Sequence, residues 1–167
     1  MLKTEPAPFM EKRNAKRIMC GNIEDDLGLL AEADWIVEAV IENRDIKQAI
    51  YRQIDSVRKA GSIVSSNTST IPCRNLMDGM EESFQRDFLI THFFNPPRYM
   101  RLLEIVSGEK TRADAVAAVS DFADRRLGKG VVDCKDTPGF IANRIGTFWI
   151  QAAVVEAFEG SVTVEEA

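Results

Sequence analysis

The sequence predicts an α/β fold whose sheet is mainly parallel. Short apolar runs alternate with segments in which apolar residues repeat at helical spacing, and this alternation is typical of parallel strands joined by helices. At 167 residues, of which 45% are hydrophobic and 28% are charged, the chain is long enough and apolar enough for one domain with a core.

The first 41 residues predict a loop followed by short strands and one short helix. Residues 1–16 are polar and contain two prolines, so we expect a loop or the frayed end of a helix. Residues 17–21 are a short strand candidate, and residues 23–31 predict a short acidic helix. Residues 35–41 are apolar except for Glu38 and predict a strand.

A capped helix and a strand are predicted next. Residues 44–59 carry apolar side chains at helical spacing, with Asn43 placed to cap the first turn. Gly61 lies just past the end of this helix, where glycine commonly stops a helix. Residues 62–66 predict a short strand.

The following segment predicts a turn, a short helix and a loop. Residues 68–72 are expected to turn into a short helix that includes Leu76. The charged residues 81–87 are expected to form an exposed connection. The apolar run Phe88–Ile90 then predicts a buried strand.

The stretch from residue 91 to residue 106 contains two candidate catalytic residues. His92, the only histidine in the sequence, ends the apolar run, and parallel-sheet proteins bind ligands at the carboxyl ends of their strands. Pro96-Pro97 forces a turn, after which a second apolar run contains Glu104. Such a carboxylate is usually paired or catalytic, because burying an unpaired charge is costly. The two residues fit either a base with its orienting partner or a core histidine beside an edge-strand glutamate.

The last part of the chain predicts a helix, a strand and a long helix. Residues 111–127 are expected to form the first helix, with Thr111 as its cap and Gly128 as its end. Residues 131–134 predict a strand. Thr137 is expected to cap a long helix with one apolar side.

The composition argues against several classes of function. The net charge is −5 and the pI is near 5.0, so no nucleic-acid-binding surface is indicated. Three widely spaced cysteines and one histidine predict neither a disulfide framework nor a metal site. We therefore expect a reducing compartment, the cytoplasm. The N-terminus lacks the apolar core of a secretory signal, and the uncharged stretch 145–155 is too short to span a bilayer.

Four motifs, in this order, resemble those of the 3-hydroxyacyl-CoA dehydrogenase family. They are Val37-Glu-Ala-Val-Ile-Glu-Asn43, Ser65-Ser-Asn-Thr-Ser69, His92-Phe-Phe-Asn-Pro96 followed by Leu102-Leu-Glu-Ile-Val106, and Lys135-Asp-Thr-Pro-Gly-Phe-Ile-Ala-Asn-Arg144. Four ordered motifs over about 110 residues are a specific signal. The form Asn95-Pro-Pro-Arg-Tyr-Met100 is most similar to the long bacterial members that are fused to an enoyl-CoA hydratase.

The resemblance implies an incomplete Rossmann-type sheet. The family carries a Gly-x-Gly-x-x-Gly fingerprint near its start, but this sequence has none, so we expect the first βαβ unit to be missing. Residues 1–136 would be the C-terminal part of the NAD-binding domain. Residues 137–167 would start an all-helical C-terminal domain that is otherwise absent. We expect Met1 to be an introduced start and not the start of a split gene.

The resemblance also implies roles for individual residues. His92 would be the general base that takes the proton from the substrate's 3-hydroxyl, and Glu104 would hold its imidazole. The remaining roles are substrate binding for Ser69 and Asn143, and NAD binding for Glu42, Lys47 and Asn95. From the residues alone, these five also fit ordinary turn, cap and helix-start positions. Glu38 matches the family pattern without a clear role.

The implied function is the oxidation of a (3S)-3-hydroxyacyl-CoA to the 3-ketoacyl-CoA with NAD, in fatty-acid β-oxidation. The implied partners are the acyl-CoA substrate and, in the full-length protein, further copies in a homo-oligomer. The chain alone is expected to be inactive, because the turn that binds the cofactor's pyrophosphate is missing. The alternative is a non-catalytic fragment that acts only as a folding or association module. A glycine fingerprint upstream in the parent gene would discriminate between the two.

Overall fold

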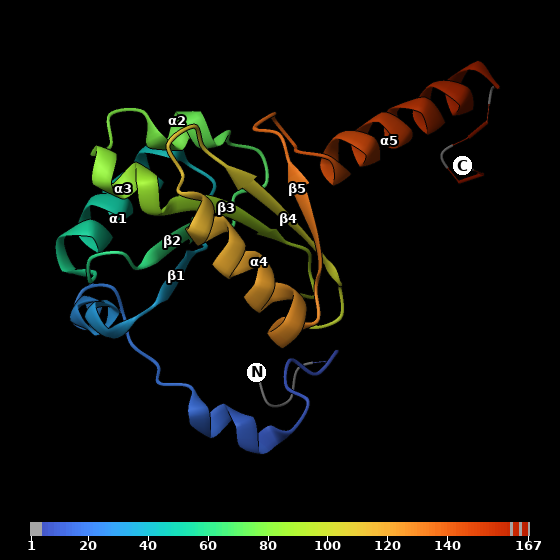
Figure 1. Cartoon of the computed structure of the whole chain (residues 1–167). Helices are drawn as coiled ribbons and strands as arrows, with labels where there is room; N and C mark the ends of the chain where they lie inside the picture. Colours follow the sequence, from blue (N-terminus) through green and yellow to red (C-terminus); the bar gives the residue numbers. More distant parts are fainter. Residues whose placement is uncertain (1–4, 161, 164, 167) are drawn as a thin grey trace.

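A five-stranded mixed sheet lies at the centre of the protein (Figure 1). The computed structural model describes residues 5–160, 162–163 and 165–166. In spatial order the strands are β1 (Trp35–Glu38), β2 (Ile63–Ser66), β3 (Phe88–Phe93), β4 (Leu102–Ser107) and β5 (Gly130–Cys134). Neighbouring strands are parallel except β3 and β4, which are antiparallel. The mainly parallel α/β sheet that the sequence predicts is therefore confirmed.

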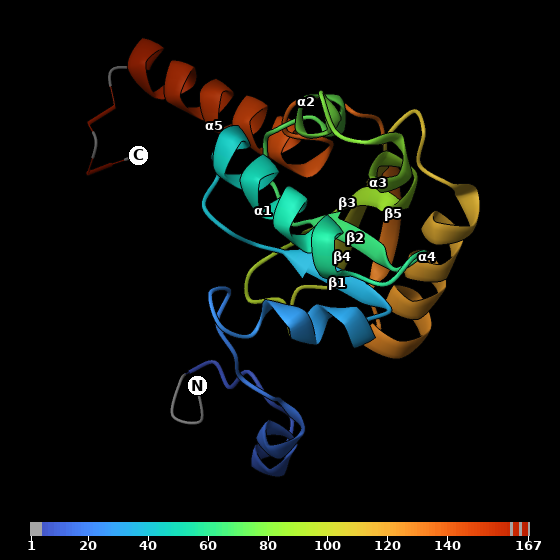
Figure 2. The same cartoon turned by 90° about the vertical axis from the view of Figure 1, so that its left-hand side faces the viewer.

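Helices cover both faces of the sheet (Figures 1 and 2). The α-helices are α1 (Arg44–Val57), α2 (Cys73–Met77), α3 (Glu82–Asp87), α4 (Ala113–Leu127) and α5 (Ala142–Glu159), and the 3-10 helices are η1 (Lys12–Arg17) and η2 (Leu27–Glu32). Helices α1, α2 and α3 lie on one face and α4 lies on the other, as Figure 2 shows. Helix α5 extends away from the sheet (Figure 1).

Strand β3 is buried on both faces and separates two cores. Phe88 and Ile90 point into the core beneath α1 to α3, where they meet Tyr51 and Phe84. Leu89, between them in sequence, points into the second core beneath α4. This alternation follows from the two-residue period of a strand. A strand covered on both faces reads as the continuous apolar run that the sequence shows.

The predicted cap of α1 and the predicted end of α4 are confirmed. Asn43 Oδ1 accepts hydrogen bonds from the amides of Asp45 and Ile46, at 3.0 and 3.1 Å, and so caps α1. Gly61 and Gly128 follow α1 and α4 with φ of +80° and +67°. Glycine adopts this left-handed conformation without steric penalty, and Gly128 is the residue at which α4 ends. Helix α1 instead ends at Val57, two residues before the predicted end, and the residue after it, Arg58, is extended, so Gly61 does not terminate this helix.

The N-terminal prediction of a strand over 17–21 is wrong. The chain forms η1 up to Arg17 and then runs irregularly, with Ile18 and Met19 exposed. The segment lies apart from the sheet (Figure 2), so it has no neighbouring strand to bond with. The predicted acidic helix is also shorter than expected, because only residues 27–32 are helical and they form η2.

Residues 81–87 are not the exposed connection that their charges predict, because residues 82–87 form helix α3. Phe84 is fully buried, with its ring 5.7 Å from that of Tyr51 and 5.8 Å from that of Phe88. Asp87 accepts hydrogen bonds from Arg58 and Arg112, both at 2.7 Å. Phe84 and Asp87 lie three residues apart, on one face of α3. Their contacts with distant residues hold the segment in a helix despite its polar composition.

Thr111 does not cap α4 as predicted. Its hydroxyl donates to the carbonyl of Phe88 at 2.6 Å and accepts from the amide of Gly108 at 2.8 Å. Thr111 therefore ties the turn after β4 to the start of β3, and α4 begins two residues later without a side-chain cap.

Helix α5 begins at Ala142, five residues after the predicted cap Thr137. Gly139 and Phe140 adopt left-handed conformations, with φ of +74° and +46°, and these interrupt the helical path. A positive φ in a bulky residue such as Phe140 is strained, and such strain is concentrated at functional sites.

The apolar side chains of α5 are largely exposed in this structure. Phe148 is 76% exposed, Trp149 is 69% exposed and Phe158 is 82% exposed. Among the helices that the structure describes, none is both long and apolar enough to cross a membrane.

Candidate active site

The strand ends bring the predicted catalytic residues together at one edge of the sheet. Strands β1, β2 and β3 are parallel, so their carboxyl ends meet at the same edge. His92 lies near the end of β3, and Glu104 lies directly opposite it on the antiparallel β4. Both side chains are buried, with His92 4% exposed and Glu104 1% exposed.

His92 and Glu104 form a hydrogen-bonded pair. Nδ1 of His92 lies 2.8 Å from Oε2 of Glu104. Because a carboxylate can only accept, Nδ1 carries the proton, which leaves Nε2 of the neutral ring as an acceptor. The Glu104 charge would also stabilise the imidazolium that forms when Nε2 takes a proton. This geometry suits a general base with its orienting partner.

Ser69 lies against the accepting nitrogen of His92. Its Oγ is 3.0 Å from Nε2, so the serine hydroxyl donates to that nitrogen. Asn143, on the first turn of α5, donates through Nδ2 to the carbonyl of Ser69 at 3.4 Å. The structure therefore brings the predicted base and both predicted substrate-binding residues together.

The chain entering α5 is attached to the same carboxylate. Oε1 of Glu104 accepts hydrogen bonds from the amides of Ile141 and Ala142, at 3.0 and 2.8 Å. These amides belong to the start of α5, where backbone donors lack partners within the helix. The buried ring of Phe140 lies 5.6 Å from the His92 imidazole. Phe140 is part of the last family motif, but no separate sequence signal points to it.

Glu42 organises the loop that carries Ser69. Its Oε1 accepts from the Thr68 hydroxyl at 2.6 Å and from the amides of Ser69 and Thr70, each at 3.0 Å. Although burial opposes it, these hydrogen bonds lower the pKa of Glu42 to about 2. Lys47 lies 3.4 Å from the other oxygen of Glu42. The Glu42 side chain is 38% exposed, whereas the Lys47 side chain is 1% exposed and its ammonium points inward.

The third predicted cofactor contact, Asn95, lies in the exposed turn after β3. It therefore lies at the same sheet edge as His92. Asn67, which belongs to the second family motif, accepts a hydrogen bond from the Phe93 amide at 2.9 Å. That hydrogen bond joins the loop after β2 to the end of β3.

Two further residues contact the site without a predicted role. Glu38 is buried and accepts from Lys47 at 2.8 Å; in the sequence it stands out as a carboxylate inside an apolar strand and as part of the first family motif. Cys134 ends β5 close to Glu104. Burial, together with the negative charge of Glu104, raises the pKa of the Cys134 thiol to about 11. The thiol therefore stays protonated at neutral pH and is a poor nucleophile.

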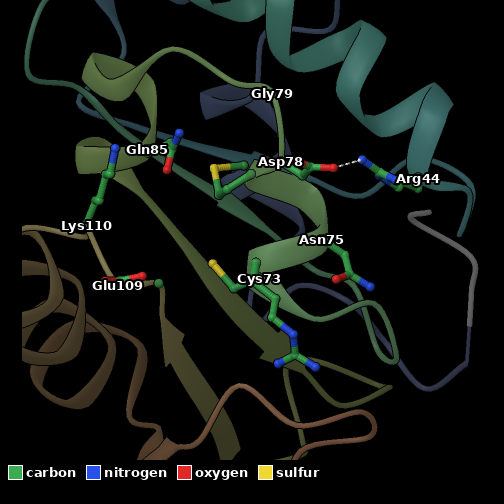
Figure 3. Close-up of a pocket in the computed structure, with 11 residues that line it drawn as sticks. Arg44, Cys73, Asn75, Asp78, Gly79, Gln85, Glu109 and Lys110 are labelled. Atoms are coloured by element: carbon green, nitrogen blue, oxygen red, sulfur yellow. Dashed lines mark hydrogen bonds and ion pairs between the residues drawn. The ribbon is translucent and has the colours of Figure 1, made fainter.

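A separate pocket of about 420 Å³ lies between α2, α3 and the turn after β4 (Figure 3). Arg44 and Asp78 form a 2.7 Å ion pair at its rim, and Lys110 pairs with Glu82 at 3.2 Å. None of the predicted site residues lines this pocket. Within the described part of the chain, no cluster of histidine, cysteine or acidic residues could hold a metal ion.

Comparison with known proteins identifies the family. Residues 3–137 match the sequence model of the family described as "3-hydroxyacyl-CoA dehydrogenase, NAD binding domain". A Bacillus subtilis protein named "Probable 3-hydroxyacyl-CoA dehydrogenase" is 48% identical over 166 residues, which is 99% of this chain and 21% of the relative. A Deinococcus radiodurans protein of the same name is 47% identical over 92% of this chain and 44% of the relative. The "Fatty acid oxidation complex subunit alpha" of Psychrobacter arcticus is 38% identical over 71% of this chain and 16% of its own length.

Solved structures agree with the sequence relatives. The 3-hydroxybutyryl-CoA dehydrogenase of Escherichia coli superposes with a TM-score of 0.75 at 33% identity, over 83% of this chain and 28% of that one. The (S)-3-hydroxybutyryl-CoA dehydrogenase of Ralstonia eutropha gives 0.76 at 35% identity, over 84% and 48%. The chain thus spans less than half the length of these relatives. It belongs to the 3-hydroxyacyl-CoA dehydrogenase family, and most of it matches that family's NAD-binding domain.

Proposed function

We propose that this chain carries the proton-transfer site of a longer enzyme that oxidises a (3S)-3-hydroxyacyl-CoA to the 3-ketoacyl-CoA in fatty-acid β-oxidation. The observation that carries the proposal is the state of His92. Glu104 holds its Nδ1 as a donor, and Nε2 is left as an acceptor with a hydroxyl group already 3.0 Å away. The geometry meets the requirement that a general base lie within hydrogen-bonding reach of the proton it takes.

The edge of the sheet has suitable groups for part of NAD. Glu42 offers a partly exposed carboxylate and Asn95 an exposed amide, at the carboxyl ends of parallel strands where nucleotides bind in such sheets. We propose that these two residues contact the cofactor, and that Lys47 contributes to the cofactor site through its ion pair with Glu42. NAD, when bound, supplies the hydride acceptor for the oxidation. The glycine-rich segment that binds its pyrophosphate is not in this sequence, and the longer enzyme would have to supply it.

His92 takes the substrate's hydroxyl proton in the proposed reaction. The O–H bond of the 3-hydroxyl breaks as Nε2 accepts the proton, and the carbon–oxygen bond becomes a carbonyl as the hydrogen on carbon leaves as hydride. Glu104 keeps Nδ1 protonated throughout, so the ring becomes an imidazolium beside a carboxylate. The pair stores the proton until it is released to solvent.

Ser69 and Asn143 are proposed to position the substrate. The Ser69 hydroxyl already lies within hydrogen-bonding distance of Nε2, so it can contact the substrate oxygen at the same point. Asn143 comes from the start of α5, which lies outside the sheet. We propose that the domain boundary lies between residues 136 and 137, so that the substrate is bound between the sheet edge and this helix.

The experiment is an assay of the full-length protein that carries this sequence. NADH formation should depend on a (3S)-3-hydroxyacyl-CoA and should be absent with the (3R) isomer, because only one face of the alcohol can direct its hydroxyl to Nε2. A folded full-length protein that forms no NADH with acyl chains of any length would contradict the proposal. It would favour a folding or association role for this segment.

A further inference from the structure

Glu38 is a buried carboxylate that the proposed reaction does not use. It is 4% exposed, and each of its oxygens accepts two hydrogen bonds. Oε1 accepts from Lys47 Nζ at 2.8 Å and from the Val40 amide at 2.6 Å. Oε2 accepts from the Tyr51 hydroxyl at 2.8 Å and from the Ser66 hydroxyl at 2.7 Å. A buried charge is tolerated only with such partners, so its position is closely fixed.

These contacts continue into a closed ring of side chains. From Glu38 the ring runs through Ser66, whose hydroxyl accepts from the Thr68 amide at 3.2 Å. The Thr68 hydroxyl donates to Glu42 Oε1 at 2.6 Å. Glu42 Oε2 lies 3.4 Å from Lys47, which returns to Glu38. Apart from Glu42, every member is at least nine-tenths buried.

The ring joins two strand ends to the loop that carries Ser69. Glu38 and Ser66 are the last residues of β1 and β2 and are paired across the sheet. Thr68 is the ring member that lies in this loop. The next residue, Ser69, donates its amide hydrogen bond to Glu42, at 3.0 Å. The backbone on which Ser69 stands is therefore fixed from both sides. The fixed backbone keeps the Ser69 hydroxyl at 3.0 Å from Nε2 of His92.

We propose that Glu38 is a positioning residue for the His92 site, acting through the ring of Glu38, Ser66, Thr68, Glu42 and Lys47. The ring holds the Ser69 hydroxyl at hydrogen-bonding distance from Nε2. This role deepens the proposed function and rests on it for its catalytic meaning. Its geometric content can be measured without any catalytic activity.

The variants are chosen to break the ring with little change in shape. Thr68→Val replaces the hydroxyl by a methyl group and removes the hydrogen bond to Glu42. Thr68→Ser keeps the hydroxyl and should keep this hydrogen bond. Glu38→Gln removes the carboxylate charge that pairs with Lys47, and its amide nitrogen can no longer accept hydrogen bonds from the hydroxyls of Tyr51 and Ser66. Tyr51→Phe is the matched control, because Tyr51 bonds Glu38 but is not a ring member.

The primary readout is the pair of imidazole nitrogen resonances of His92 in the isotope-labelled 167-residue chain. As the sole histidine, it gives one unambiguous set of signals. Ser69→Ala provides the reference for an Nε2 that has lost its hydroxyl partner. Thr68→Val and Glu38→Gln should shift the Nε2 resonance in the direction of Ser69→Ala. Thr68→Ser and Tyr51→Phe should leave it close to that of the unchanged chain.

The second readout is turnover of the full-length protein. Displacing a positioned group by about 1 Å can lower a rate up to about 100-fold, so we expect Thr68→Val to lower kcat at least ~10-fold with KM nearly unchanged.

The proposal is overturned if folded Thr68→Val keeps the unchanged Nε2 resonance. The Thr68→Val measurement decides the proposal even if Glu38→Gln fails to fold. If the resonance shifts as expected but the unchanged full-length protein forms no NADH, the positioning role stands and the proposed function fails.

Discussion

Replacing Glu104 by glutamine should place the proton on the wrong nitrogen of His92. Glu104→Gln keeps the length and shape of the side chain, and its remaining oxygen can still accept from the amides at the start of α5. The new NH₂ group then lies where Oε2 now accepts from Nδ1, at 2.8 Å. Two donors cannot face each other at this distance, so the ring must accept through Nδ1 and carry its proton on Nε2. A protonated, neutral Nε2 cannot act as a base.

The magnitude follows from the contacts that Glu104 makes. In the Ser-His-Asp triad, the equivalent change lowers kcat about 10⁴-fold through the wrong tautomer, and we expect a loss of up to about this size here. Hydrogen bonds to charged groups contribute about 1.5–3 kcal/mol and neutral ones about 0.5–1.5 kcal/mol. The two bonds to the α5 amides become neutral, so we expect the free energy of unfolding to fall by about 2–3 kcal/mol.

The assay is kcat/KM of the full-length protein with a short-chain 3-hydroxyacyl-CoA. Glu109→Gln, at an exposed glutamate after β4, is the matched control and should behave like the unchanged protein. The double variant with His92→Gln should lose little more than His92→Gln alone. Full activity in Glu104→Gln would refute the orienting role.

Three further predictions follow from the same contacts. Phe84→Ala should lower the free energy of unfolding by about 3–5 kcal/mol in urea titrations, because Phe84 is fully buried. Ser83→Ala, at an exposed neighbour, should change the free energy of unfolding little. Equal effects of the two variants would contradict the packing of α3. The folded-state pKa of Glu42, about 2, lies below the ordinary value of 4.5, so its stabilisation is present above pH 4.5 and is lost as pH falls toward 2. After discounting for a side chain that is 38% exposed, Glu42→Gln should cost about 1–2 kcal/mol at pH 7 and progressively less below pH 4.5; a difference independent of pH would contradict this. The 167-residue chain should bind NAD weakly in calorimetry, since its sequence lacks the glycine fingerprint, and submicromolar binding would contradict that expectation.

Much of the fold was predictable because its signals are local. Three of these signals depend on residues close in sequence: the apolar run ending at His92, the cap at Asn43 and the glycine that ends α4. The prediction failed where distant contacts decide the structure. Helix α3 is charged, but Phe84 and Asp87 hold it to residues more than 20 positions away.

The site was predictable in its members but not in its connections. Motif order indicated His92, Glu104 and Ser69, and the structure places them within hydrogen-bonding distance. Nothing in the sequence shows that Glu104 also accepts from the start of α5, because that contact spans 37 and 38 positions. The role of Glu38 was hidden for the same reason, since its partners come from β2 and α1.

The most direct test of the central claim is turnover of His92→Gln in the full-length protein. Glutamine keeps a polar side chain of similar reach but cannot take the proton. Loss of a positioned general base typically lowers a rate about 10²–10⁴-fold, so kcat should fall at least ~100-fold while the affinity for NAD stays nearly unchanged. Turnover close to that of the unchanged enzyme would show that His92 is a core residue and would contradict the enzymatic account of this site.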